Sequence, residues 1–100
     1  MSVSMAIRSF RRSEIADLFF DGQLNQRAGW SGGVKIVTRK LDMLHYAQKL
    51  DDLRSPPANR REALKGNLRG LFSIRINDQW RICFRWTTSG PEDVEIVDYH

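Results

Sequence analysis

Three runs in the last third of the chain alternate apolar and polar residues with period two, and no other feature constrains the fold as strongly. The runs cover residues 71–76, 80–86 and 94–99. Strands with one buried face alternate in this way, because successive side chains point to opposite sides of a sheet. We therefore predict three antiparallel strands. Their shared apolar face is formed by Phe72, Ile74, Ile76, Trp80, Ile82, Phe84, Trp86, Val94 and Ile96.

The turn between the first two runs fixes their register, since facing residues must lie on the same side of the sheet. A two-residue turn at residues 78–79 would place Ile76 opposite Arg81 and mix the two faces. A three-residue turn at residues 77–79 places Ile76 opposite Trp80, and we prefer it. The further pairs that this register predicts are Ile74 with Ile82 and Phe72 with Phe84.

The connection over residues 87–93 leads into the third run, and the same alternation sets its register. The pairs that it predicts are Trp86 with Val94, Phe84 with Ile96, Arg85 with Glu95, and Arg81 with Tyr99. On the polar face of the first hairpin, Arg75 faces Arg81. Like charges directly opposed across strands are destabilising, and the arginine fork suits a phosphate. The pair indicates an anion site, although two solvated arginines would give the same pattern.

Two helices are predicted in the first half of the chain. Ser13 is a candidate N-cap, and the first helix ends at residues 21–22. Apolar residues spaced three and four apart predict a longer helix over residues 31–48, whose apolar stripe packs on the sheet. The stripe is formed by Val34, Val37, Leu41 and Leu44, and the side chains expected to face water are Lys35, Arg39, Lys40 and Asp42.

The remaining segments complete a single α+β domain over residues 1–100. Residues 6–10 are expected to form a short strand that adds to the sheet, and residues 1–4 are expected to be a loose end. An extended connector at residues 56–59 leads into the last three strands. The expected order is β-α-α-β-β-β, a small twisted antiparallel sheet with two helices packed on one face.

Composition narrows the class of protein. The one cysteine, Cys83, excludes an internal disulfide, and two distant histidines give no structural zinc spacing. Because no apolar run reaches the length of a membrane span and no signal-peptide pattern is present, we expect a cytoplasmic protein. The formal net charge of +4 favours an anionic partner, with nucleic acid first. The basic residues of the C-terminal segment are Arg60, Arg61, Lys65, Arg69, Arg75, Arg81 and Arg85.

The same segment holds the parts that metal-free RNA cleavage requires. The 2′-hydroxyl of RNA is itself the nucleophile, so the protein has to move protons and stabilise charge on the phosphate. The candidate proton-handling groups are Asp98, Tyr99 and His100, and the candidate phosphate-binding groups are Lys65, Arg75 and Arg81. Strand alternation places Tyr99 on the opposite side from Asp98 and His100, although a chain end departs readily from ideal strand geometry.

Three segments, residues 64–66, 73–84 and 98–100, resemble the HigB toxins of the RelE superfamily. The order of strands and helices is similar too. The resemblance implies a ribosome-dependent endoribonuclease that cuts mRNA in the A site and stops translation, with no metal or other cofactor. It also implies a HigA-like antitoxin with a helix-turn-helix domain, through which alone the complex binds operator DNA, and no membrane partner.

Site residues follow from the resemblance by position. Lys65 and Arg81 match basic residues that bind the phosphate and stabilise the transition state, and Asp98, Tyr99 and His100 match the C-terminal catalytic run. The further cations expected to bind RNA are Arg69, Arg75 and Arg85.

One position departs from the pattern of the resembling family. Some HigB toxins carry a histidine two or three residues before the Leu-Lys-Gly segment, where this chain has Arg61, Glu62 and Ala63. Glu62 is therefore a candidate acid or base. Two other functions stay open on the sequence: an RNA- or ribosome-binding module that does not cleave, and a degenerate toxin that acts as an antitoxin-bound co-repressor.

Overall fold

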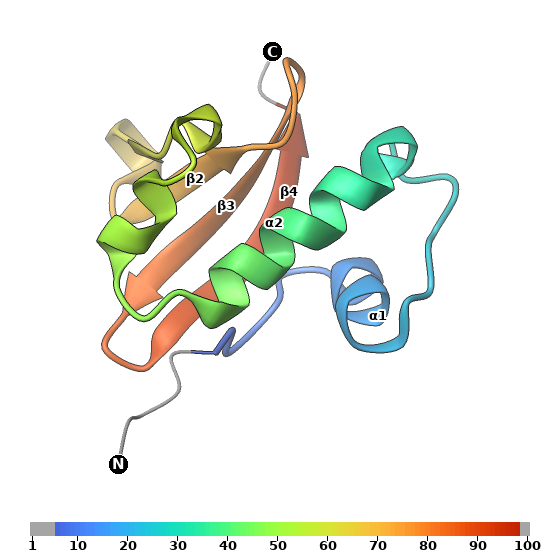
Figure 1. Cartoon of the computed structure of the whole chain (residues 1–100), viewed down its shortest axis with the longest axis horizontal. Coiled ribbons are helices and arrows are strands. Elements are labelled where there is room, and N and C mark those ends of the chain that lie inside the picture. The colour runs from blue at the N-terminus through green and yellow to red at the C-terminus, as the bar shows by residue number, and fades with distance from the viewer. Residues whose placement is uncertain (1–5, 99–100) are drawn as a thin grey trace.

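A four-stranded antiparallel sheet packs against two helices in the computed structural model, which describes residues 6–98 (Figure 1). The strands are β1 (Glu62–Ala63), β2 (Leu71–Arg75), β3 (Trp80–Thr87) and β4 (Gly90–Asp98), and they lie side by side in that order. The helices are α1 (Ser13–Asp21) and α2 (Val34–Tyr46), and α2 crosses one face of the sheet. The predicted α+β class, with its helices on one face of the sheet, is confirmed.

Helix α1 begins and ends for identifiable reasons. Ser13 is its first helical residue and makes no capping hydrogen bond, so the expected N-cap is wrong; the cap position is Arg12. The predicted end is confirmed: Gly22 takes a φ of 70°, a left-handed conformation that glycine adopts without strain. Its N–H donates to the carbonyl of Leu18 at 3.0 Å, which closes the last turn.

Helix α2 presents its predicted apolar stripe to the sheet. Val37, Leu41 and Leu44 have no exposed surface. The helix is shorter than predicted, because residues 31–33 form a separate 3-10 turn and Ala47 turns into extended backbone. Beyond Ala47 the N–H groups of residues 48 and 49 donate to the Asp52 carboxylate at 3.0 and 3.2 Å. This carboxylate replaces the backbone carbonyls that would accept from them in a longer helix.

The β2–β3 hairpin has the predicted register. The observed pairs are Phe72 with Phe84, Ile74 with Ile82, and Arg75 with Arg81. Asn77 sets the turn, because its side-chain oxygen accepts hydrogen bonds from the N–H groups of Gln79 and Trp80, each at 2.9 Å. A side-chain acceptor that mimics a backbone carbonyl is a common device at such turns.

The predicted β3–β4 register is wrong. The observed pairs are Ile82 with Ile96, Cys83 with Glu95, Arg85 with Glu92, Trp86 with Pro91, and Arg81 with Val97. Two features shift the pairing. The turn is tighter than expected, since β4 begins at Gly90, and β4 advances three residues from Glu92 to Glu95 while β3 advances two. The extra residue forms a β-bulge, and Asp93 within it has a φ of 53°.

The N-terminal segment adds to the sheet at the β4 edge, but only through an isolated parallel bridge between Phe10 and Val94. Val94 donates to the carbonyl of Ser9 at 3.1 Å, whereas the N–H of Asp93 donates to the Ser9 hydroxyl at 2.8 Å. The Ser9 hydroxyl thus replaces a backbone carbonyl in one hydrogen bond between the two segments, next to the bulge, and no regular strand forms. The strand at the opposite edge is β1, which the sequence did not predict.

The hydrophobic core lies between the helices and the sheet. Its fully buried members among residues 6–98 include Ile15, Val37, Leu41, Leu44, Ile74, Ile82, Phe84 and Val94. Burying an aliphatic or aromatic side chain contributes about 1.5–3 kcal/mol, so this layer holds the sheet and its helices together. The core also decides which face of the sheet remains for function.

Candidate functional site

The sheet face that points away from the helices carries the polar residues of each strand. By alternation from the core positions, its members are Leu71, Ser73, Arg75, Arg81, Cys83, Arg85, Glu95 and Val97. We call this the open face. The segment that leads through β1 into β2 borders it, because Glu62 pairs with Ser73 and Ala63 pairs with Phe72.

Arg81 lies at the floor of the open face and is only 5% exposed. Its Nε donates to the Ser73 hydroxyl at 2.8 Å, and its Nη2 donates to the backbone carbonyl of Arg60. The predicted position opposite Arg75 is confirmed. Arg75 is turned aside, however, into an ion pair with Asp78, so the two guanidinium groups do not form one exposed anion clamp.

A buried network holds the carbonyl that Arg81 binds. Arg60 has a φ of 44°, and the side chain of the preceding Asn59 has no exposed surface. Asn59 donates to the Leu53 and Ser55 carbonyls at 3.1 and 3.3 Å and accepts a hydrogen bond from Lys40. Lys40 in α2 thereby connects the helix layer to the loop that positions Arg81.

The expectation that Lys40 faces water is wrong, since its exposed fraction is 6%. Burial, followed by the positive charges of Arg39 and Arg75, lowers the pKa of Lys40. The signal was present in the sequence: Lys40 stands three residues after Val37 and four before Leu44, inside the apolar stripe.

Lys65 and Glu62 border the open face from the β1 segment and are both exposed. Gly66, with a φ of 68°, begins the 3-10 turn Gly66–Leu68 directly after Lys65. Glu62 pairs with Ser73, the residue whose hydroxyl binds Arg81. The structure therefore brings Glu62, Ser73 and Arg81 together, with Lys65 on the neighbouring turn.

Arg69 and Arg85 lie near each other farther along the same face. Arg69 is exposed, and Nη1 of Arg85 lies 3.1 Å from the position that a Cβ on Gly70 would occupy. The predicted pairing of Arg85 with Glu95 is wrong, because Arg85 faces Glu92 and approaches the Asp93 carboxylate at 3.9 Å. This exposed ion pair is weak, so both arginines can meet an anion.

The C-terminal run is described only as far as Asp98. Asp98 is exposed at the end of β4, pairs with Trp80 and accepts a hydrogen bond from Gln79 Nε2 at 3.1 Å. Tyr99 and His100 lie outside the described residues. Arg81 faces Val97 at the position where the sequence predicted Tyr99.

A pocket of about 220 Å³ hollows the open face. Its lining residues are Arg11, Leu64, Leu68, Leu71, Cys83, Glu95, Val97 and Asp98. The sequence did not predict this pocket, because Leu64 and Leu68 belong to the irregular segment between β1 and β2, whose position over the sheet no periodicity shows. Burial, only partly offset by nearby Arg81, raises the pKa of the Cys83 thiol to about 11.

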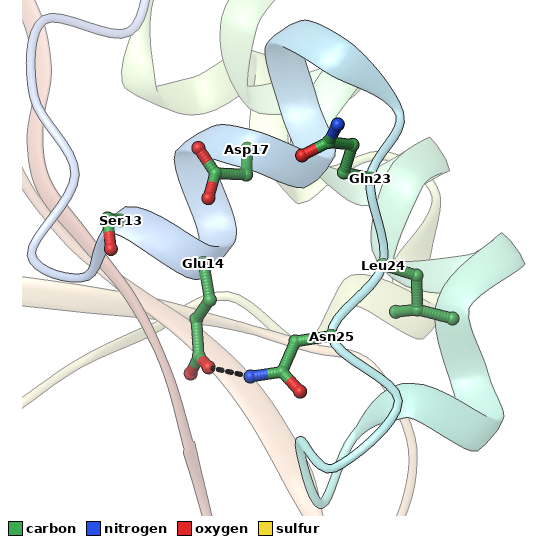
Figure 2. Close-up of a pocket in the computed structure, with 6 residues that line it drawn as sticks. All are labelled: Ser13, Glu14, Asp17, Gln23, Leu24 and Asn25. Atoms are coloured by element: carbon green, nitrogen blue, oxygen red, sulfur yellow. Dashed lines mark hydrogen bonds between the residues drawn. The ribbon is translucent and has the colours of Figure 1, made fainter.

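A second hollow, of about 360 Å³, lies on the helix side of the molecule beside α1 (Figure 2). Glu14 and Asp17 line it, and Glu14 accepts a hydrogen bond from Asn25 at 2.9 Å. Its lining contains two carboxylates and no cation. It would repel a phosphate, so the open face is the candidate anion site.

Two features of residues 6–98 bear on function. No three histidine, cysteine, aspartate or glutamate side chains in this part of the chain group closely enough to hold a metal ion. Within the same residues no helix is both long and apolar enough to cross a membrane.

The chain is similar to known proteins. A family model described as the RelE-like toxin of the type II toxin–antitoxin system HigB matches residues 8–100. Toxin HigB-1 of Vibrio cholerae is 56% identical over 68 residues, which cover 68% of this chain and 72% of that protein. An uncharacterized Haemophilus influenzae protein is 42% identical over 52 residues, 52% of each chain. A solved YoeB/ParE toxin from Agrobacterium tumefaciens aligns over 94% of each chain with a TM-score of 0.49 and 19% identity.

Proposed function

Because the chain belongs to the HigB-like toxins of type II toxin–antitoxin systems, we propose that it cleaves mRNA in the ribosomal A site, without a metal ion. The observation that carries the proposal is the position of Arg81. Its guanidinium is fixed by Ser73 and Arg60 at the floor of a face that Lys65 borders. A charge held in place before the reaction needs no reorganisation when charge develops on a phosphate.

Each predicted site residue has a role in this reaction. Lys65 is exposed and contacts the scissile phosphate, while Arg81 stabilises the charge that forms on it. Asp98, Tyr99 and His100 move the protons, one from the 2′-hydroxyl and one to the leaving 5′-oxygen. Glu62 is a further candidate base, because it stands beside Ser73 on the same face. The cations that hold the RNA backbone are Arg69, Arg75 and Arg85.

The family also supplies the partner class. A toxin of a type II system has an antitoxin partner, and we propose a HigA-like protein with a helix-turn-helix domain. Operator DNA is then bound only through that antitoxin. Because the substrate is mRNA on ribosomes, the place of action is the cytoplasm.

Two non-cleaving functions are the alternative, because the burial of Arg81 is compatible with them as well. An arginine that is 5% exposed and bonded to Ser73 and Arg60 is also what a purely structural role would produce. The domain would then bind RNA or the ribosome, or act as an antitoxin-bound co-repressor, without cutting.

Single-turnover cleavage on programmed ribosomes separates these functions. We expect Arg81→Ala to slow cleavage by about 100- to 1,000-fold, the usual cost of removing one transition-state donor, while ribosome binding is retained. The control is Arg27→Ala, which removes an exposed arginine from the loop after α1. Cleavage by Arg81→Ala at the normal rate, in a folded protein, would remove Arg81 from the mechanism.

A further inference from the structure

The pocket on the open face is apolar inside. Leu64, which precedes the 3-10 turn Gly66–Leu68, and Leu68, which ends it, form one wall, while Leu71 and Val97 form the sheet side around Cys83. Its volume, about 220 Å³, is below the roughly 300–1,000 Å³ of pockets that hold drug-sized ligands. The space therefore suits one flat ring system.

One wall of the pocket is an apolar side chain that is unusually exposed to solvent. Leu68 has 49% of its surface in contact with solvent and is one of three large apolar residues so exposed among residues 6–98. The Cys83 thiol at the pocket floor is uncharged at neutral pH, and burial, which raises its pKa further to about 11, disfavours the thiolate there. Removing the apolar surface of Leu68 from water is favourable, so the pocket favours an apolar ligand that covers this side chain.

The rim of the pocket is polar and carries hydrogen-bond acceptors. Glu95 and Asp98 both line it, next to Arg11. The Glu95 carboxylate is held by Arg11 at 3.6 Å and Arg12 at 3.5 Å. These arginines are 62% and 64% exposed, so they fix the carboxylate while remaining accessible to an anion.

The charges around the pocket identify the class of ligand. Exposed cations stand on both sides of it: Arg11 and Arg12 on the N-terminal segment, and Lys65 and Arg69 on the turn that carries Leu68. A flat apolar ligand flanked by negative charges is a base in a nucleic acid strand. Proteins that take a base out of its stack hold it between aromatic or apolar side chains, and surfaces that bind single strands hold the phosphates on cations.

We propose that this pocket binds one nucleobase of the RNA strand, held between Leu68 and the sheet residues Leu71 and Val97. The proposal deepens the function proposed above and rests on it, because it assigns a base to the same face on which the phosphate is cleaved. The pocket lies between the turn after Lys65 and the end of β4 at Asp98, so the bound base belongs to a nucleotide close to the scissile phosphate.

The rim also predicts which bases are accepted. Carboxylates accept hydrogen bonds from amino groups, as they do from the N4 group of cytosine. Adenine, cytosine and guanine each carry an exocyclic amino group with two N–H donors, whereas the base edge of uracil has one donor, N3–H, between two carbonyl oxygens that a carboxylate repels. Glu95 and Asp98 therefore favour an amino-bearing base over uracil.

Nucleoside monophosphates test the pocket directly, with neither ribosome nor cleavage involved. We would titrate the full chain with AMP, CMP, UMP and ribose 5-phosphate at millimolar concentrations and follow the methyl NMR signals of Leu64, Leu68, Leu71 and Val97. We expect these signals to shift with AMP and CMP and much less with UMP. AMP should bind about tenfold more tightly than ribose 5-phosphate, the usual contribution of one stacked base.

Leu68→Ala removes the exposed wall and should weaken AMP binding about five- to tenfold, leaving ribose 5-phosphate unaffected. The matched control is Phe20→Ala, which removes an exposed apolar side chain, 67% accessible, from α1 on the helix side of the sheet. It should leave both affinities unchanged.

Two outcomes would overturn the proposal. One is that AMP and ribose 5-phosphate shift the same signals equally, which would leave only phosphate binding. The other is that no nucleotide shifts the pocket methyl signals while the purified antitoxin does, which would make the pocket a protein docking site. Either result leaves ribosomal cleavage to be judged separately, and a chain that cannot cleave would still show the base-dependent shifts.

Discussion

At the scale of single residues, the position of Arg81 depends on side chains far from the open face. Lys40 in α2 donates to Asn59, Asn59 fixes the loop through the carbonyls of Leu53 and Ser55, and Arg60 then presents its own carbonyl to Arg81. Arg60 holds a left-handed conformation to do so. For a residue other than glycine such a conformation is uncommon and persists where surrounding contacts determine it.

Lys40→Met tests this network. Methionine nearly fills the same volume but leaves the Asn59 side-chain oxygen without its donor, so we expect the free energy of unfolding to fall by about 1–3 kcal/mol. Because Arg60 is then less firmly held, single-turnover cleavage should slow while ribosome affinity stays unchanged. Lys35→Met, on the water-facing side of α2, is the control for urea unfolding and for cleavage. Equal cleavage rates for the two variants would limit Lys40 to a structural role.

Cys83 makes the stability of the fold depend on pH. Its pKa is raised from 9.0 to about 11 by burial, so in the alkaline range the unfolded thiol ionises first and the folded state binds more protons. Stability from this group is complete below pH 9 and is lost as the pH rises towards about 11.

Urea unfolding of the wild type and Cys83→Ala, below pH 9 and near pH 11, measures this loss. The wild type should lose roughly 2 kcal/mol more than the variant across the range, since each unit of pKa difference corresponds to about 1.4 kcal/mol. Parallel curves for the two proteins would mean that the thiol is not buried as described.

At the scale of elements, the two hairpins show what alternation can predict. The β2–β3 register followed from the sequence because both strands are regular and Asn77 closes a three-residue turn. The β3–β4 register did not, because the extra residue at Asp93 adds one position to β4. Alternation counts positions and cannot detect an inserted one. Aspartate adopts a left-handed conformation readily enough to remain unremarkable in a sequence.

The bulge at Asp93 allows a prediction about the stability of variants at this position. Asp93 has a φ of 53°, which a β-branched residue adopts only with strain. Asp93→Val should therefore lower the free energy of unfolding by about 1–2 kcal/mol, as expected for a left-handed non-glycine residue. Asp93→Gly should be close to neutral, although it also removes the partner of Arg85. If valine and glycine cost the same amount, backbone strain at the bulge is not the cause.

At the scale of the whole molecule, the helices cover one face of the sheet and leave the other to the cations. The sequence predicted this division, because the alternating strands and the stripe of α2 each have one apolar side. It did not predict the pocket. Leu64 lies in the segment after β1 and Leu68 ends the 3-10 turn, and only the tertiary structure places them beside Leu71 and Val97. The C-terminal run was predicted from its residue types and from family resemblance, and Tyr99 and His100 remain predictions.

The most direct test of the central claim is to map mRNA 5′ ends after adding the purified protein to programmed ribosomes. Parallel reactions contain EDTA-treated protein or naked mRNA. We expect new 5′ ends within the A-site codon, unchanged after EDTA treatment of the protein and absent on naked mRNA. Ribosomes that bind the protein while their mRNA stays intact would contradict this expectation and leave the open face as a binding surface alone.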